Sequence, residues 1–359
     1  MPITRSYCAT HLAILVGIAF AQPAAAQTGA ANDLAACRDM AGPDVALPAC
    51  RRVSQNSAAP VADRVEAYTT AGTIQLAQPA TATADFTEAL KLDPSFYPAY
   101  TGRAMAELMQ HQLDKADADL QKASALNQKG DPETFYVMGL VAEARGDHEA
   151  KIAYMSKILA VVPDSYEAYS GRGNGYLAEG KYDQAVADLK KAVALNPDAA
   201  PVLKLNLFAA YTGRGTDRMA HGQPQSAVDD FTQAITLDPQ SATAFNNRGD
   251  AYNMMEEYGQ AIQDLTKSIE LDRNYAVAYL NRGVSYIKMH QPDQAIKDLT
   301  RAIALDGERP LAYLMRGEAY IDIPNKAAAL DDFRRGLALT PETDPDRALI
   351  QAEIYNLSR

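Results

Sequence analysis

The sequence predicts an all-α, right-handed solenoid of about eight helix pairs, and three observations support this fold class. Residues 247–249, 281–283 and 315–317 read Asn-Arg-Gly, Asn-Arg-Gly and Met-Arg-Gly, a period of 34 residues. Within each period, apolar side chains recur at spacings of three and four, which is the period of a helix face. Prolines such as Pro197 and Pro239 close the periods, where they bias the preceding residue away from helix. A fixed period of this size indicates stacked copies of one helical unit, each stable only against its neighbours.

Residues 1–26 have the features of an export signal. Arg5 gives a positive start, residues 12–21 form a short apolar run, and residues 24–26 are three alanines suited to cleavage. The apolar run is too short to span a bilayer, and no later stretch is apolar enough. An uncleaved anchor is the alternative. We expect cleavage, no membrane insertion of the mature chain, and a location in the periplasm or outside the cell.

The cysteine count agrees with export. Cleavage would remove Cys8 and leave Cys37 and Cys50, an even number in an oxidising compartment. We therefore expect these two to form a disulfide within an N-terminal cap over residues 27–61, with two free thiols as the alternative. Because the sequence has no Cys-x-x-Cys pair, neither a redox motif nor a zinc site is indicated.

The chain is acidic, with 34 Lys+Arg, 45 Asp+Glu and a net charge of −11. Loss of the leader, whose one charged residue is Arg5, would lower the charge by one further unit. Nucleic-acid phosphates and anionic membrane surfaces repel such a protein, so neither is expected as a partner.

Residues 242–275 show how one unit is predicted to fold. Each half places its apolar side chains on one helical face, which predicts a hairpin of two helices. Gly249 and Ala261 are small where the two backbones must approach closely, whereas Phe245 and Leu265 fill the space between layers.

This pattern resembles the tetratricopeptide repeat, which has an aromatic residue at its fourth position and glycine at its eighth. The fourth position here holds Tyr68, Tyr100, Phe135, Tyr169, Tyr211, Phe245, Tyr279 and Tyr313. The eighth holds Gly72, Ala104, Gly139, Gly173, Gly215, Gly249, Gly283 and Gly317. The resemblance covers eight units within residues 62–342. It implies a scaffold that holds proteins or peptides in a concave groove.

Two stretches depart from the repeat. The fifth unit is longer, since Gly173 and Gly215 lie 42 residues apart, and an insertion around residues 200–208 should add about two helical turns. Its apolar side chains are expected to pack on the preceding helix, with a partner surface as the alternative. Residues 343–359 begin with Asp344-Pro345, a good helix start, and are predicted to form a closing helix over the last repeat.

Arginine and aspartate recur together in six units. The seventh position holds Arg103, Arg172, Arg214, Arg248, Arg282 and Arg316, and the twenty-third holds Asp119, Asp188, Asp230, Asp264, Asp298 and Asp332. We expect ion pairs between the two helices of a unit, Arg248 with Asp264 and Arg282 with Asp298 among them. Solvated charges are the alternative. The first unit weakens the case, because its Asp85 faces Ala71.

No set of residues has the pattern of a catalytic or metal site. The sequence contains no His-Glu-x-x-His, and the glycines around residue 173 lie inside a repeat helix rather than in a phosphate-binding loop. We therefore expect no enzymatic activity, no metal and no cofactor.

The resemblance also implies which side chains face the groove, since positions two, five, nine, twelve and thirteen of each first helix line it in that family. The candidate contact residues, here called the groove residues, are Asn246, Asp250, Asn253, Val277, Leu280, Val284, Ile287, Leu311, Leu314 and Glu318. The groove should be polar in its middle and apolar toward the C-terminus, unless the closing helix and the superhelical twist bury the apolar part. The function favoured is a non-enzymatic adaptor in the bacterial periplasm. A self-assembling structural component of the cell envelope is the alternative.

Overall fold

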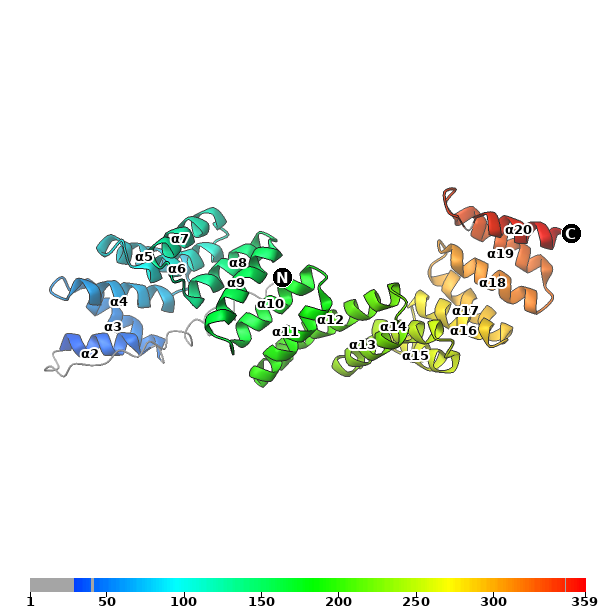
Figure 1. The fold of residues 1–359 in the computed structure, drawn as a ribbon, viewed down its shortest axis with the longest axis horizontal. Helices are drawn as coiled ribbons and strands as arrows, with labels where there is room; N and C mark the ends of the chain where they lie inside the picture. The colour runs from blue at the N-terminus through cyan, green and yellow to red at the C-terminus, as the bar shows by residue number, and fades with distance from the viewer. Residues whose placement is uncertain (1–28, 40–41, 346) are drawn as a thin grey trace. The chain divides into compact units, whose positions relative to one another are not determined.

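The protein is an all-α repeat solenoid, so the predicted fold class is confirmed. In the computed structural model, residues 29–39, 42–345 and 347–359 are described, and the regular structure among them is helical throughout. The predicted export signal, residues 1–26, lies outside the described residues. The described helices include none that is long and apolar enough to cross a membrane. The described residues divide into two compact units: those up to residue 179 together with 191–196, and those of 180–190 together with 197–359. Figure 1 labels the helices of both.

The first unit is a series of antiparallel helix pairs preceded by two cap helices. The cap is α2 (Gly29–Arg38) and α3 (Pro43–Gln55). The repeat helices are α4 (Val61–Ile74), α5 (Pro79–Leu92), α6 (Tyr97–Met109), α7 (Leu113–Leu126), α8 (Pro132–Ala144), α9 (His148–Val161) and α10 (Tyr166–Ala178). Helix α11 (Tyr182–Leu195) contributes residues to both units.

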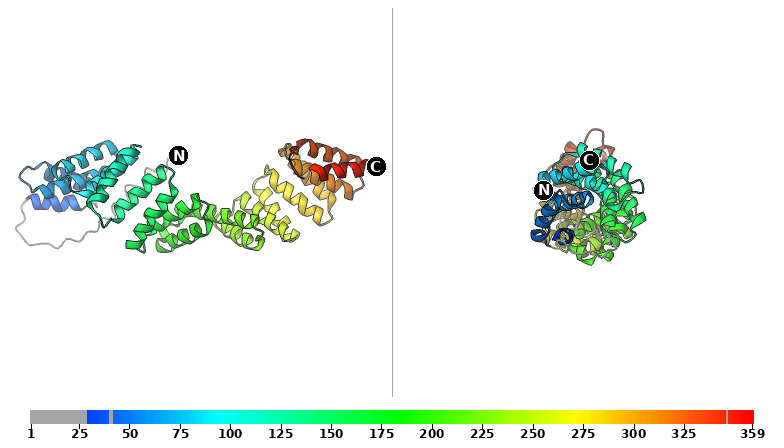
Figure 2. Two further views of the ribbon diagram at one scale, coloured as in Figure 1. Left: turned by 45° about the horizontal axis from the view of Figure 1, so that its top comes forward. Right: turned by 90° about the vertical axis from the view of Figure 1, so that its left-hand side faces the viewer.

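The second unit continues the same arrangement and ends in a single helix. After a 3₁₀ turn at Pro197–Ala199 come α12 (Ala200–Ala220), α13 (Pro224–Leu237), α14 (Ala242–Met254), α15 (Tyr258–Leu271), α16 (Ala276–Lys288), α17 (Pro292–Leu305), α18 (Pro310–Asp322), α19 (Lys326–Leu339) and α20 (Arg347–Ser358). The views of Figure 2 follow these helices from two further sides. Helix α20 packs on α19, as a closing helix would.

The insertion lengthens helix α12, which has 21 residues where the other first helices have 13 or 14. Leu203 and Leu207 of the added turns are buried, at 4% and 7% exposure, so half of the apolar stripe packs inward. Val202 and Leu205 remain exposed at 48% and 71%.

Small residues let the two helices of a repeat approach each other. A Cβ atom on Gly249 would lie 2.7 Å from Cγ of Leu265, and a Cβ on Gly283 would lie 2.7 Å from Cγ of Leu299. Real Cβ atoms essentially never come this close, so glycine is required where the neighbouring leucine fills the layer.

The turn between the helices of a repeat places one residue in the left-handed backbone region. Gly146, Gly180 and Gly222 have φ values of 75°, 68° and 69° there. In three other repeats the same place is taken by residues with a side chain, His111, Glu256 and His290, at 58°, 61° and 55°. These three backbones carry a steric cost that glycine avoids.

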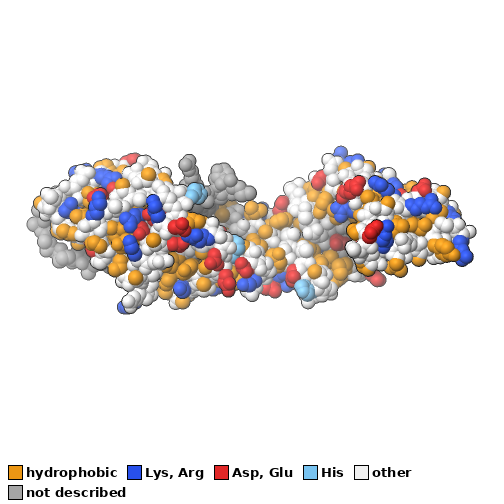
Figure 3. Space-filling model, turned by 90° about the horizontal axis from the view of Figure 1, so that it is seen from above, with side chains coloured by type: hydrophobic (Ala, Val, Ile, Leu, Met, Phe, Trp, Pro, Cys, Tyr) orange, Lys and Arg blue, Asp and Glu red, His pale blue; other side chains and the backbone are white. Residues whose placement is uncertain are grey.

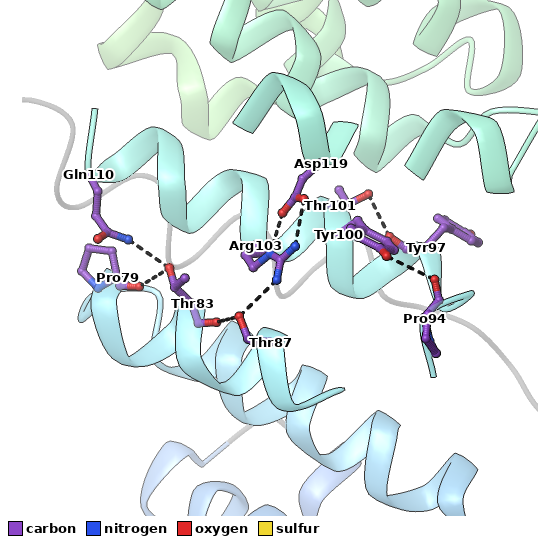
Figure 4. Close-up of polar contacts among 10 residues, drawn as sticks. All are labelled: Pro79, Thr83, Thr87, Pro94, Tyr97, Tyr100, Thr101, Arg103, Gln110 and Asp119. Atoms are coloured by element: carbon purple, nitrogen blue, oxygen red, sulfur yellow. Dashed lines mark hydrogen bonds and ion pairs between the residues drawn. The ribbon is translucent and has the colours of Figure 1, made fainter. Parts of the chain in front are cut away.

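In several repeats an arginine of the first helix binds an aspartate of the second helix through two nitrogens, an arrangement here called an arginine fork. Its third nitrogen contacts the preceding repeat. Arg248 donates to Asp264 from Nε at 2.6 Å and Nη2 at 2.9 Å, and Arg282 binds Asp298 with the same two distances. The third nitrogen, Nη1, donates to a threonine one repeat earlier: Arg248 to Thr232, Arg282 to Thr266 and Arg316 to Thr300. Figure 4 shows the equivalent set in the first unit, with Arg103 between Asp119 and Thr87. The pair of Arg172 with Asp188 stays a prediction.

The N-terminal cap is held by the predicted disulfide, which is confirmed between Cys37 in α2 and Cys50 in α3, with Cα atoms 4.7 Å apart. The residue after each cysteine is an arginine that binds the first repeat. Arg38 donates twice to Glu66 of α4 at 2.6 Å, and Arg51 donates to Asp85 of α5. The disulfide therefore joins two segments that each contact the array through an arginine.

Candidate functional site

The first helices of the repeats in the second unit pack on one another, which brings the groove residues together. Helix α14 contacts both α12 and α16, and α16 contacts α18. Side chains at equal positions of these helices are therefore neighbours along one face. In the face drawn in Figure 3, hydrophobic side chains are interspersed with acidic and basic ones.

Amide and hydroxyl groups join α14 to α16. The Asn281 side chain donates to Oδ1 of Asn246 at 3.2 Å, and the Asn253 side chain donates to the Asn281 backbone carbonyl at 3.2 Å. Ser285 donates to Oδ1 of Asn253 at 2.6 Å. This network fixes the orientation of the amides. It also leaves one N–H of Asn253 without an acceptor among the described residues, because an asparagine amide has two donors.

Asn246 and Asn253 differ in their access to a ligand. Asn246 is almost fully buried at 4% exposure, and it also donates to Asn247 at 3.1 Å. Asn253 is half-buried. Asn246 therefore positions the network, whereas Asn253 can meet a bound chain directly.

Asp250 lies on α14 between these asparagines and is half-buried. Burial raises the pKa of its carboxyl group above the ordinary value. Within the described part of the chain, no hydrogen bond or ion pair to this carboxylate is found. A half-buried carboxylate without a donor is unfavourable, so the group is suited to binding a cation from outside.

The apolar groove residues do not all face outward. Leu280 and Ile287 are buried at 3% and 6% exposure, in one core cluster with Ala312 and Ala319 of α18. They offer almost no surface to a partner, because the following first helix covers them.

The remaining apolar groove residues are partly exposed to solvent. Val277, Val284 and Leu314 are half-buried. Leu314 packs closely on Gly336 of α19, since a Cβ on that glycine would lie 2.6 Å from Cδ2 of Leu314. Leu311 is exposed at 48%. Glu318 is half-buried, and no ion pair of its carboxylate is found among the described residues.

One buried titratable residue was not anticipated from the sequence. Glu107 of α6 is 6% exposed, and its Oε2 has no hydrogen-bond partner among the described residues. Burial and then the neighbouring Asp119 raise the pKa of Glu107 to about 7. The sequence contained a sign of this residue. Glu107 stands at the repeat position that holds Tyr252 and Tyr286 in later repeats, so an acid replaces an aromatic residue there.

The described residues include no group of three or more His, Cys, Asp or Glu side chains that could hold a metal ion. His111 and His290 lie in turns between helices.

Comparisons with known proteins address the repeat itself. The family model described as tetratricopeptide repeat matches residues 166–199, 242–275 and 276–308. The search of curated proteins found no match. Among solved structures, a crystal structure of MamA protein is 22% identical, covers 58% of this chain and 91% of that chain, and has a TM-score of 0.32.

Two further solved structures are repeat domains. The first such domain of Spaghetti (RPAP3), bound to the HSP90 peptide SRMEEVD, is 27% identical and covers 34% of this chain and 93% of that chain, with a TM-score of 0.31. The Arabidopsis OM64 domain is 25% identical and covers 32% of this chain and 94% of that chain, with a TM-score of 0.30.

Proposed function

This chain belongs to the tetratricopeptide-repeat family, and from that premise we propose that it is a non-enzymatic adaptor that holds an extended segment of another protein against α14, α16 and α18. The observation that carries the proposal is the oriented amide network of Asn246, Asn281 and Asn253. An asparagine amide offers a donor and an acceptor, and a peptide backbone needs both. A rigid amide also loses little conformational freedom on binding.

The apolar surface beside the amides supports the same function. Val277 and Val284 are half-buried on α16, and Leu311 is exposed on α18. Contact with a ligand's apolar side chains would contribute about 25 cal/mol for each Å² removed from water. The amides would then fix the peptide's main chain, and these side chains would contribute much of the affinity.

The proposed location is the periplasm or the outside of the cell. The support is the disulfide between Cys37 and Cys50, because disulfides persist in oxidising compartments. The leader predicted at residues 1–26 agrees with it.

Selection from a random peptide library on the purified protein tests the function. Enriched peptides should bind the wild type and lose at least about tenfold in affinity to the double variant Asn253→Lys/Leu311→Lys, which fills the groove with charge. The matched control is Gln263→Lys/Ala304→Lys, at exposed positions of the second helices α15 and α17. No enrichment, or equal loss in both variants, would contradict a peptide-binding groove.

Self-assembly is the second candidate, and the exposed Val202 and Leu205 of α12 favour it. Sedimentation over a range of protein concentrations should then show association that Leu205→Lys abolishes. A monomer at every concentration would exclude this function without affecting the first.

A further inference from the structure

Asp250 is an exception to the way the second unit treats its buried carboxylates. Asp230, Asp264, Asp298 and Asp332 are each bound by an arginine fork from the same repeat. Asp250 receives no hydrogen bond among the described residues, and burial alone raises the pKa of its carboxyl group. No hydrogen bond or ion pair from a described basic side chain therefore offsets this charge, and a cation from a partner would stabilise it.

A second acid stands at the same repeat position two repeats later. Asp250, Val284 and Glu318 each occupy position nine of their helices, α14, α16 and α18. All three are half-buried, and no described cation pairs with either acid. The series along the groove is therefore acid, apolar, acid.

The other groove positions do not neutralise this pattern. Across positions two, five, nine, twelve and thirteen of α14, α16 and α18, the acids are Asp250, Glu318 and Asp322 and the one base is Lys288. Lys288 is exposed at the C-terminal end of α16. A basic ligand would thus meet complementary charge, which favours association and excludes acidic segments.

The spacing of the three residues selects a conformation of the ligand. Packed helices lie roughly 8–10 Å apart, so position nine recurs at about that distance from α14 to α16 to α18. A polyproline II segment rises 3.1 Å per residue with three residues per turn, so its residues i, i+3 and i+6 share one face at about 9 Å intervals. A regular β-strand would instead turn alternate residues away.

We propose that this groove selects an extended, polyproline-like segment in which two lysines or arginines flank an apolar residue at three-residue spacing. The first cation pairs with Asp250, the apolar side chain contacts Val284, and the second cation pairs with Glu318. The available N–H of Asn253 binds the main chain beside Asp250. This inference rests on the proposed function, whose ligand class it names.

Fluorescence anisotropy with labelled synthetic peptides tests the proposal. The probe is Gly-Lys-Pro-Pro-Leu-Pro-Pro-Lys-Gly, and its partners replace both lysines by glutamine, both by glutamate, or move one lysine by one residue. We expect the first peptide to bind at least about tenfold more tightly than the glutamine form, and the glutamate form to bind least. The shifted lysine should lose most of that advantage.

Protein variants locate the contacts. Asp250→Asn and Glu318→Gln should each weaken the lysine peptide about tenfold and leave the glutamine peptide unchanged, because the loss is specific to the cation. Asp331→Asn removes an exposed acid of the second helix α19 and should change neither. Both groove variants are isosteric, and far-ultraviolet circular dichroism verifies that they fold.

The outcomes separate this inference from the function beneath it. Equal binding of lysine and glutamine peptides, with sensitivity to Asn253→Lys/Leu311→Lys retained, would overturn the basic ligand and keep the groove. Absence of binding by all peptides, together with an unenriched library, would overturn both. The protein could also self-associate, with no peptide binding and with Asp250→Asn converting the oligomer to monomer. The groove would then be occupied by a second copy of the chain, and the peptide proposal would be overturned.

Discussion

Arg51 in the cap helix α3 donates to the carboxylate of Asp85 in the first repeat, with Nη2 at 2.8 Å from Oδ2. In the paired repeats this aspartate is bound by an arginine of its own repeat, but the first repeat has Ala71 at that place. Gln75 adds a third donor to Asp85 at 2.7 Å. The cap is thus docked by the same chemistry that joins the helices within later repeats.

Arg51→Met should therefore destabilise the first unit by about 2 kcal/mol, because it leaves Asp85 buried with the amide of Gln75 as its one remaining side-chain donor. Urea unfolding of the full chain measures this loss. The control is Arg52→Met, which breaks an exposed pair with Asp33 and should lower the stability much less, because solvent screens that pair. Equal small losses would show that the cap is held by the disulfide and apolar contacts instead.

Glu107 should make stability depend on pH. Its pKa is about 7 in the folded chain and near 4.5 when unfolded, so the folded state binds the proton more tightly. That stabilisation is fully present below about pH 4.5 and is lost as the pH rises through about 7. Glu107→Gln should thus be more stable than the wild type at pH 8, by about 2 kcal/mol, and nearly equal at pH 4.5.

Thermal unfolding between pH 4.5 and 8.5 tests this expectation. Glu133, whose pKa burial also raises to about 7, remains in that variant, so part of the pH dependence should persist until Glu133→Gln is added. A single variant that behaves like the wild type at pH 8 would show that the carboxylate is solvated at little cost.

The left-handed turn residues provide a pair of opposite substitutions. Glu256→Gly should stabilise by up to about 1 kcal/mol, since glycine adopts φ near 61° without steric cost. Gly222→Ala should destabilise by about 1 kcal/mol through its backbone alone, because a Cβ there would meet no atom within 4 Å. Urea unfolding of both variants and the wild type measures the two changes in unfolding free energy. Changes of the same sign would contradict this account.

Asp250→Asn should raise the stability of the second unit while weakening a basic ligand. The amide carries no charge to desolvate, so a gain of about 1 kcal/mol in unfolding free energy is expected at pH 8. The gain should shrink as the pH falls through the raised pKa of the Asp250 carboxyl group, because protonation removes the charge. Calorimetry at both pH values measures it, and a stability loss at pH 8 would indicate an undetected partner for the carboxylate.

The repeat register predicted the helix pairs because the glycine, alanine and leucine positions encode how closely two helices approach. The sequence identified Gly249 as a point of close approach and Leu265 as a filling residue, and the structure places the two against each other. The arginine forks could be predicted for the same reason, since the arginine and the aspartate, such as Arg248 and Asp264, recur at fixed positions of each unit. Contacts within a repeat join residues close in sequence, so the repeat pattern predicts them.

Contacts that extend beyond one repeat could not be predicted from the repeat pattern. Arg51 lies outside the repeats, so no periodic pattern marked it as the partner of Asp85. Leu280 occupies a groove position but is covered by α18, because burial there depends on how closely successive repeats pack. Asp250 was identified as a groove residue, but its lack of a donor is a property of the packed neighbours.

The threonine contacts of the arginine forks have a mechanical consequence. In the second unit, Arg248, Arg282 and Arg316 each reach back to the preceding repeat, so a tensile force along α13 to α19 would load a charged hydrogen bond at every junction. The third repeat has Met138 where the arginine would be, and its junction with the second repeat lacks that bond. Under tension that junction would instead load the hydrogen bond between Thr101 and Thr134 and the ion pairs of Arg145 with Asp114 and Asp117.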